Sequence, residues 1–502
     1  ALKVTDHWSL QGVLYYRQYA QDIANGNTTD YTSCTTAALS GSLCQPDGLT
    51  PVTNAAGQNL PDISAAGELP IGENDFETIN AYGRGATLQA SNHQSIFDHD
   101  NRFTAGVTLD QAHVNFYSGA QIGVLNPQLL VLPSELIVDT PESSPFGATP
   151  VMLAADTRDL GGYVTDTFSL TPALALTASG RFDVATIDLH DQRGTSLDGN
   201  SRFRHFNPAF GGTYKVSPKL TAYAGVATNT RTPTASEIEC SDPLKPCLLP
   251  SNLAGDPPNL RQVVAHTVEL GVRGNIPGAS GADRGLSWNL GVFRTNSFND
   301  IYGIATSASS GFFQNIGSTR REGLEAGLDY QSGRWSYYVN YSHVDATFRS
   351  AIQLPSPSNP HQDADGNIEV RPGDRLPGIP KNRIKAGIDY AITPQWKVGA
   401  ALIVASSQYY FGDESNQNAP MPGYGVVNLH ASYQVGRHLE LFGSINNLFN
   451  ARYATYGTYS DPTGIGAPGI PLDGETNGPG VDNRFLSPAA PIAVYGGVRI
   501  SL

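Results

Sequence analysis

The chain has 502 residues and a formal net charge of −14, with 40% hydrophobic but only 15% charged residues. This charge argues against nucleic-acid binding, because phosphates demand a basic protein face. No stretch approaches the ~18 apolar residues of a membrane-spanning helix, and the best, Val398 to Ala405, is far shorter, so only strands could cross a membrane.

Apolar and polar residues alternate in segments along the whole chain. Alternate side chains of a strand lie on opposite faces, so the pattern predicts strands with one apolar and one polar column. In chain order these are a stump at Leu2 to Val4 and sixteen full strands at 8–20, 81–91, 101–122, 157–169, 173–190, 202–216, 219–230, 262–275, 286–305, 312–330, 334–349, 381–392, 395–410, 422–435, 438–447 and 490–502.

Several strands show the alternation clearly. The apolar columns are Trp8, Leu10, Leu14 and Tyr16; Leu174, Leu176, Ala178 and Phe182; Trp396, Val398, Ala400, Leu402 and Val404; and Leu439, Leu441, Gly443 and Ile445. A soluble β-sandwich also alternates, because one sheet face meets the core. The number of strands favours an all-β transmembrane antiparallel barrel over residues 1–502.

The links between strands are alternately tight and very long. Tight links are predicted at Thr5 to His7, Ser169 to Pro172, Val216 to Pro218, Gln331 to Gly333, Thr393 to Pro394 and Gly436 to Arg437, and long loops at 21–80, 231–259, 350–380 and 450–487. Bacterial outer-membrane barrels have short periplasmic turns and long outer loops. This order places Leu502 in the periplasm.

The four cysteines form two close pairs, each inside a predicted long loop. Cys34 with Cys44 and Cys240 with Cys247 predict two loop-stapling disulfides in an oxidising compartment. The alternative is zinc binding by all four, but neither pair has the two-residue spacing of a zinc knuckle. No signal peptide begins at Ala1, so we expect a mature or truncated boundary there.

Enzyme motifs are absent: there is no Gly-x-Ser-x-Gly, Walker loop or His-Glu-x-x-His. We therefore expect no enzyme, no cofactor and no resident metal. His93 and His99 lie near Asp98 and Asp100 in a predicted turn, where a solvated polar turn is favoured over a metal site. The segment 363–367 begins like a calcium loop but has a misplaced Gly and lacks the closing Glu, which favours an ordinary turn.

Six motifs occur in an order that resembles the TonB-dependent transporters of Gram-negative outer membranes. They are Tyr163 to Asp183, with its Gly-Arg-Phe-Asp ending; Phe206 to Glu237, ending in Arg-Thr-Pro-Thr-Ala-Ser-Glu; Asn299-Asp-Ile301; Gln314 to Glu325; Arg375 to Asn382; and Ile445 to Tyr453. The last segment, Pro491 to Leu502, resembles the C-terminal strand recognised by the outer-membrane assembly machinery, with Leu502 in place of the usual Phe.

The resemblance implies a 22-stranded barrel, of which this chain supplies about 16 to 17 strands, around an N-terminal plug that carries a segment for TonB. Neither the plug nor the first strands are visible, and the stump at Leu2 would be about the sixth strand. Either the chain is a fragment, or the missing part is a separate polypeptide, or this is a smaller barrel of about sixteen strands. An open sheet would leave unpaired edges in lipid, which favours the fragment.

The motifs also have structural interpretations, which we favour over direct contact with a ligand. Gly323 and Gly327 beside Arg320, Arg321, Glu322 and Glu325 predict a lumen-facing ladder of opposite charges. Asn446 and Asn447 before Phe449 predict a strand end at which side chains bond free backbone groups.

Ligand recognition in the family implies aromatic and polar groups on the outer loops. The candidates here are Tyr409, Tyr410, Phe411, Tyr453, Tyr456 and Tyr459. For Tyr409 to Phe411 the alternative is the interfacial aromatic girdle of a barrel.

The resemblance implies active, TonB-dependent uptake of a scarce solute, with a ferric siderophore or other metal complex as the leading candidate. The implied partners are the TonB-ExbB-ExbD complex, outer-membrane lipid and lipopolysaccharide. Alternatives are a passive general porin, a receptor for cobalamin, another cofactor, a sugar or a peptide, and, from other classes, a surface adhesin or a barrel enzyme.

Overall fold

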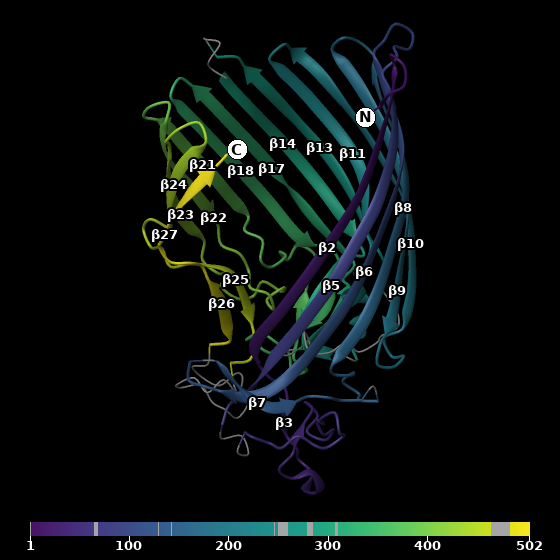
Figure 1. Ribbon diagram of the computed structural model, residues 1–502, viewed down its shortest axis with the longest axis vertical. Coiled ribbons are helices and arrows are strands. Elements are labelled where there is room, and N and C mark those ends of the chain that lie inside the picture. Colours follow the sequence, from purple (N-terminus) through teal and green to yellow (C-terminus); the bar gives the residue numbers. More distant parts are fainter. Residues whose placement is uncertain are drawn as a thin grey trace.

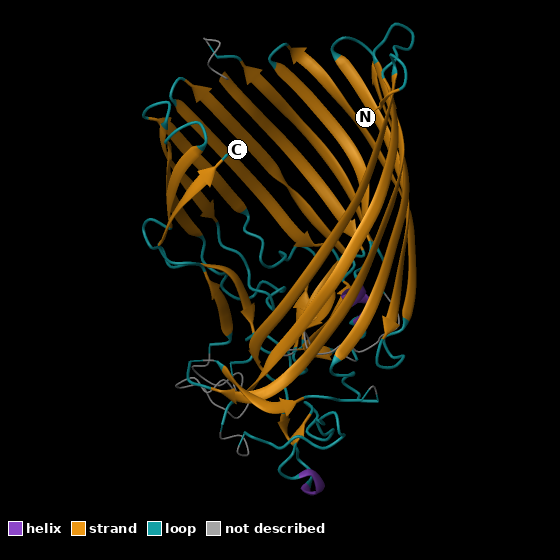
Figure 2. Cartoon of the chain, in the orientation of Figure 1, coloured by secondary structure: helices purple, strands orange, loops and turns teal. Residues whose placement is uncertain are grey.

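In the computed structural model the described residues are 2–64, 69–128, 130–141, 143–244, 246–248, 260–278, 285–306, 310–462 and 482–501. Antiparallel strands make up most of them and form one large sheet that curves into a barrel wall (Figures 1 and 2). This confirms the predicted all-β barrel fold. Within the described residues, none of the helices has the length and apolar character needed to cross a membrane.

The large sheet has 18 strands. Two of them, β1 (Leu2–Lys3) and β7 (Val131–Ile137), are short. The other sixteen correspond one to one with the sixteen predicted full strands. Each pairs with the next in chain order. They are β2 (Trp8–Thr28), β5 (Ile71–Asn92), β6 (Asn101–Leu125), β8 (Val151–Ser169), β9 (Leu174–Asp191), β10 (Gly199–Ser217), β11 (Leu220–Arg231), β13 (Val263–Ile276), β14 (Gly285–Phe298), β17 (Ser318–Ser332), β18 (Trp335–Phe348), β21 (Asn382–Ala391), β22 (Trp396–Ala405), β23 (Tyr424–Gln434), β24 (Leu439–Asn446) and β27 (Ala493–Ile500).

Two predicted strands are broken where the backbone changes direction. Asn299 has φ 52° and Gly317 has φ 81°, so the predicted 286–305 and 312–330 each divide there. The freed pieces, β15 (Ile301–Ala305) and β16 (Ser310–Asn315), leave the wall and form a small sheet with β12 (Cys247–Leu248). The left-handed region is accessible to Gly and tolerated by Asn, which explains the two residue types.

Three neighbouring strands are much longer than a bilayer requires. β2, β5 and β6 have 21, 22 and 25 residues, whereas about 9 to 11 suffice to cross the hydrocarbon. The prediction ended the first strand at residue 20 and began the next at 81 because alternation stops there. Pairing nevertheless continues to Thr28 opposite Gly72, so the wall extends far beyond the apolar band.

The remaining elements lie in the long loops. They are the hairpins of β3 (Thr32–Ser33) with β4 (Leu43–Cys44), β19 (Ile352–Pro355) with β20 (Asn367–Val370), and β25 (Ala454–Tyr459) with β26 (Arg484–Pro488), the turn η1 (Ala37–Leu39) and the helix α1 (Ala235–Glu239). Figure 1 shows β3, β7, β25 and β26 at one end of the wall and both marked chain ends toward the other. The predicted terminal Leu502 is outside the described residues.

The two columns of the wall differ in chemistry. Apolar side chains of one column are exposed, such as Leu14 at 84%, and Leu88 and Val107 lie opposite one another in the same column. The other column is polar: the hydroxyl of Tyr15 donates to Asp110. At the loop end this polar column continues into Ile122 of β6, which loop residues cover in a buried cluster. The polar column therefore faces the interior, and the apolar column faces outward, as a lipid-facing surface does.

The wall is open along one line. β2, with β1, is the outermost strand on one side and β27 on the other, and no pairing between them occurs in the described residues. Figure 2 shows this separation between the two edges. Within the described residues, the backbone groups along β27 and along β2 beyond its short pairing with β1 have no sheet partners, which is costly in lipid.

Candidate functional site

Four of the six candidate ligand residues gather in one aromatic cluster at the loop end, defined as Tyr410, Phe411, Tyr456 and Tyr459. The rings of Phe411 and Tyr456 stack with centroids 5.2 Å apart, and those of Tyr410 and Tyr459 lie 5.4 Å apart. Backbone bonds set this arrangement: Phe411 N–H donates to Gly457 O at 3.0 Å and Tyr459 N–H to Phe411 O at 2.8 Å. Two loops distant in sequence are thus joined.

A cavity of about 130 Å³ lies beside this cluster. Its lining comes from four loop segments and includes Tyr302, Ser356, Phe411, Glu414, Tyr456 and Tyr459. Pockets for drug-sized ligands measure roughly 300 to 1,000 Å³. The cavity therefore fits a single small group of a ligand, such as one ring, rather than a whole metal chelate.

Burial favours the neutral forms of the ionisable groups of the cavity. Glu414 is buried and accepts hydrogen bonds from the Tyr302 hydroxyl at 2.8 Å and from Gly412 N–H at 3.0 Å. Burial raises the pKa of Glu414 above its ordinary value and raises the pKa of Tyr302 well above 10. Burial also raises the pKa of Tyr459 to about 12. Such a lining favours aromatic or neutral polar groups.

The candidates differ in accessibility. Tyr410 and Tyr459 are buried, at 3% and 8%, whereas Tyr456 is 44% exposed. β22 ends at Ala405, so Tyr409 to Phe411 lie beyond the wall strand, and the buried Tyr410 does not have the exposure of a girdle residue. Phe411 and Tyr456 are the members of the cluster that can meet a ligand.

Two candidates lie outside this cluster. The Arg375 guanidinium sits over the Tyr409 ring, 5.9 Å from its centroid. Tyr453 stacks on Tyr424, with centroids 4.4 Å apart. Both rings therefore have protein partners of their own.

A buried polar network beneath the aromatic cluster was not predicted. Asn359 donates to Gly412 O at 2.6 Å, Asn418 donates to Asp413 at 2.9 Å, and both Asn359 and Asp413 are fully buried. Asn416 accepts from Arg375 N–H at 2.6 Å, which connects this network to the Arg375 motif. Asn359 lies far in sequence from Asp413, Asn416 and Asn418, so no spacing in the sequence indicated that they form one network.

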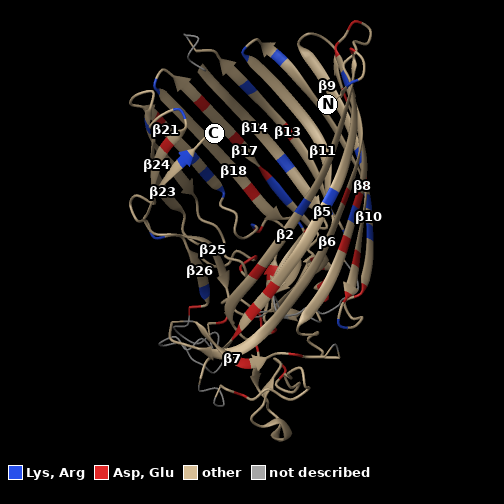
Figure 3. Ribbon diagram, in the orientation of Figure 1, with Lys and Arg blue, Asp and Glu red and all other residues tan. Residues whose placement is uncertain are grey.

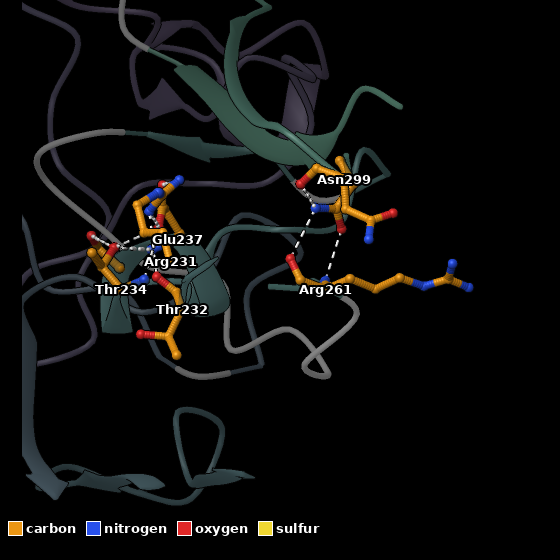
Figure 4. A network of polar contacts seen from close by, with 8 residues as sticks. Arg231, Thr232, Thr234, Glu237, Arg261 and Asn299 are labelled. Atoms are coloured by element: carbon orange, nitrogen blue, oxygen red, sulfur yellow. Dashed lines mark hydrogen bonds and ion pairs between the residues drawn. The ribbon is translucent and has the colours of Figure 1, made fainter. Parts of the chain in front are cut away.

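The Arg231 motif is structural. The Arg231 guanidinium donates to both oxygens of Glu237, and Thr234 and Glu237 form a reciprocal cap at the start of α1 (Figure 4). In a second set of contacts, Asn315 bonds the backbone of Arg261 and donates to Asn299 O at 2.7 Å; Arg261 and Asn299 are labelled in Figure 4. Both motifs hold loop segments where they leave the wall.

The predicted lumen-facing charge ladder is wrong for half of its members. Arg320 and Glu322 share the outward column of Leu324 and Leu328, because side chains alternate along β17. There Glu322 pairs with Arg294 of β14 at 2.6 Å. Only the alternate residues face inward, and Arg321 pairs there with Asp300 at 3.1 Å.

Asn447 behaves as expected for the strand-end box. Its side chain donates to Ala451 O at 2.9 Å and to Ala490 O at 3.1 Å and accepts from Ala451 N–H at 2.8 Å. With φ 52°, it turns the chain at the end of β24.

Both predicted disulfides are present, Cys34–Cys44 and Cys240–Cys247, and both lie in loops outside the wall. At the calcium-like segment, Asp363 accepts backbone N–H bonds from Asp365 and Asn367, as an ordinary Asx turn does. Among the described side chains, no three His, Cys, Asp or Glu converge in a way that could hold a metal ion.

Known proteins resemble the chain in sequence and in fold. The profile of the family described as "TonB dependent receptor-like, beta-barrel" matches residues 2–448. The "Probable TonB-dependent siderophore receptor PiuA" of Acinetobacter baumannii is 25% identical over 193 residues, which cover 38% of this chain and 24% of that protein.

Solved structures extend the likeness to nearly the whole chain. The crystal structure of the siderophore receptor PiuA from Acinetobacter baumannii has a TM-score of 0.67 at 14% identity, covering 99% of this chain and 62% of that one. "Copper transporter OprC" has a TM-score of 0.61 at 16% identity, covering 100% and 63%. The chain thus spans less than two thirds of each protein, and these structural likenesses show the fold alone.

Proposed function

The chain belongs to the TonB-dependent receptor-like β-barrel family, and from this premise we propose that it forms the wall and outer loops of an active transporter in the Gram-negative outer membrane. One observation supports this most: a wall with a polar inner column and an outward apolar column carries an aromatic loop cluster at one end. Ligand capture by the loops would precede passage along the polar interior.

The proposed cargo is a ferric siderophore or another metal complex. One sequence relative supports this class, since it is named a siderophore receptor, and a protein of the same fold is named a copper transporter. Phe411 and Tyr456 offer stacked aromatic faces of the kind that bind ring-bearing chelators. The protein supplies binding and a path, and no reaction.

The proposal includes what completes the wall and drives transport. Further strands outside this sequence would pair with β2 and β27, and a plug would fill the interior and receive force from TonB with ExbB and ExbD. Outer-membrane lipid, including lipopolysaccharide, would surround the outward column. The open edges of the sheet support the first of these points.

Uptake of iron-55 tests the proposal. The receptor that contains this chain is expressed in a strain lacking its own siderophore receptors, with and without TonB, and supplied with a panel of ferric siderophores. We expect TonB-dependent uptake of at least one, reduced about tenfold or more by Phe411→Ala with Tyr456→Ala. Phe210→Ala, on the exposed outward column, is the matched control. TonB-independent passage with channel conductance would instead indicate a porin.

A further inference from the structure

Arginines line up on the outward face of five adjacent strands. Arg84 of β5 lies directly opposite Gln111 of β6, which lies opposite Arg158 of β8. The row continues through Thr186 of β9 to Arg202 of β10. With strands about 4.8 Å apart, successive arginines in this row are roughly 10 Å apart. Figure 3 shows basic residues on these neighbouring strands.

A fourth arginine joins them, because Arg204 is the next outward residue of β10. Arg84, Arg158, Arg202 and Arg204 are together the arginine row. All four side chains are exposed.

The arginine row lies where the apolar band ends. Toward the short-turn end, the next outward residues on β8 and β10 are Leu160 and Phe206, which are 49% and 55% exposed. On β5 the same column continues through Ala86 to Leu88. Opposite Arg84 is Tyr16, an exposed aromatic residue of the kind found at membrane interfaces. On β5, β8 and β10 the arginines therefore stand at the loop-end limit of the run of outward apolar residues of their own strand.

The charges of the arginine row are not neutralised within the described chain. Arg158, Arg202 and Arg204 have no ion-pair partner among the described residues, and Arg84 bonds only the neutral Gln111 amide, at 3.0 Å.

The nearest outward carboxylates have partners of their own. Asp156 bonds His113 at 2.9 Å, and Asp188 accepts from Asn200. The four arginines therefore carry positive charge without an ion-pair partner, although the chain as a whole has a net charge of −14.

Another outward arginine shows the alternative arrangement. Arg294 of β14 also follows the apolar residues of its column, but it is paired with Glu322 at 2.6 Å. The protein therefore neutralises an outward arginine on one part of the wall and leaves four unpaired on another. Arginine presents planar donors that match phosphate oxygens, and basic groups at a membrane boundary attract anionic headgroups.

We propose that the arginine row binds the phosphate groups of the phosphorylated glycolipid of the outer leaflet. The proposal rests on the proposed outer-membrane location, because the loop end then faces the outer leaflet. Spacing of roughly 10 Å allows one headgroup carrying two phosphates to engage two arginines. The row thereby gives the wall a preferred lipid on one side.

Native mass spectrometry of the detergent-purified receptor tests this, with diphosphoryl lipid A, monophosphoryl lipid A and phosphatidylglycerol as probes. The test variant combines R84Q, R158Q, R202Q and R204Q, and the control variant is R294Q. We expect the wild type and R294Q to retain diphosphoryl lipid A most strongly and the fourfold variant to bind it at least about tenfold more weakly. Heat-modifiable gel mobility checks that each variant is folded.

Equal binding of diphosphoryl lipid A by the fourfold variant would overturn the proposal, as would a wild-type preference for phosphatidylglycerol. Iron-55 uptake is measured on the same variants. Loss of lipid binding with retained uptake supports the arginine row independently of cargo. A wild type that binds the lipid but transports no siderophore contradicts the proposed cargo alone.

Discussion

Two parallel hydrogen bonds join the guanidinium of Arg231 to the carboxylate of Glu237, at 2.9 and 3.1 Å. The same carboxylate accepts the Thr234 N–H at 2.7 Å and so closes the cap of α1. Burial alone would raise the pKa of Glu237, but these hydrogen bonds lower it overall. The chain is thereby fixed where it leaves β11 and enters the loop of the second disulfide.

Arg231→Lys should loosen this loop without disturbing the wall. A lysine ammonium cannot make both parallel bonds, so we expect the opening free energy of α1 to fall by about 1 to 2 kcal/mol. Hydrogen exchange of the α1 amides measures it, with Arg437→Lys in a tight turn as control. Unchanged exchange in α1 would show that the paired geometry contributes nothing.

Reducing both disulfides should free loop segments only. Cys34–Cys44 joins β3 to β4 and Cys240–Cys247 joins the end of α1 to β12, and none of these elements belongs to the large sheet. We expect faster proteolysis of these loops after reduction and an unchanged thermal transition of the barrel on gels. A clear fall in that transition temperature would contradict the assignment of the cysteines to loops.

The wall was predictable because each strand carries its own signal. Alternation is local, so columns such as Leu439, Leu441 and Ile445 were found in the sequence, and the register places them opposite Ile500, Val498 and Val494. The strand breaks at Asn299 and Gly317 were missed because a single residue in the left-handed conformation leaves the alternation of apolar and polar residues on either side almost unchanged. The extensions of β2 and β5 were missed because their few apolar residues, such as Ile23, Phe76 and Ile79, do not recur at every second position.

The candidate site was only partly predictable. Aromatic runs identified Phe411 and Tyr456, but their stacking depends on backbone bonds between two loops. Tyr302 follows the motif Asn299 to Ile301 and Glu414 follows Phe411, but nothing in either loop indicates that the two side chains meet. Contacts between distant loops leave no periodic pattern in either loop.

The aromatic cluster should be more stable at acidic than at neutral pH. The folded-state pKa of Glu414 is raised by burial, so its contribution is fully present below its unfolded value and is lost as the pH rises through the raised value. Protection of the β25 and β26 amides, corrected for intrinsic exchange, should therefore decrease as the pH rises from below the ordinary pKa of a glutamate through the raised pKa of Glu414.

Glu414→Gln should remove this dependence. The amide oxygen can still accept from Tyr302 and Gly412, but the side chain no longer titrates. Glu369→Gln, at an exposed position of β20, is the control and should keep the wild-type profile. Protection that increases with pH in the wild type would reverse the sign and exclude Glu414 as its cause.

Asn447 allows the backbone and side-chain contributions of the strand-end box to be separated. Asn447→Gly keeps the left-handed conformation but loses the three side-chain hydrogen bonds, so we expect a loss of about 1 to 3 kcal/mol. Asn447→Ala adds the cost of placing a Cβ in that region, about 1 kcal/mol more. Asn450→Gly, at φ 49° with one such bond, is the control and should cost less than Asn447→Gly. Urea unfolding in lipid vesicles measures these differences in the free energy of unfolding. If Asn447→Gly and Asn450→Gly lower it equally, the additional hydrogen bonds of Asn447 do not stabilise the end of β24.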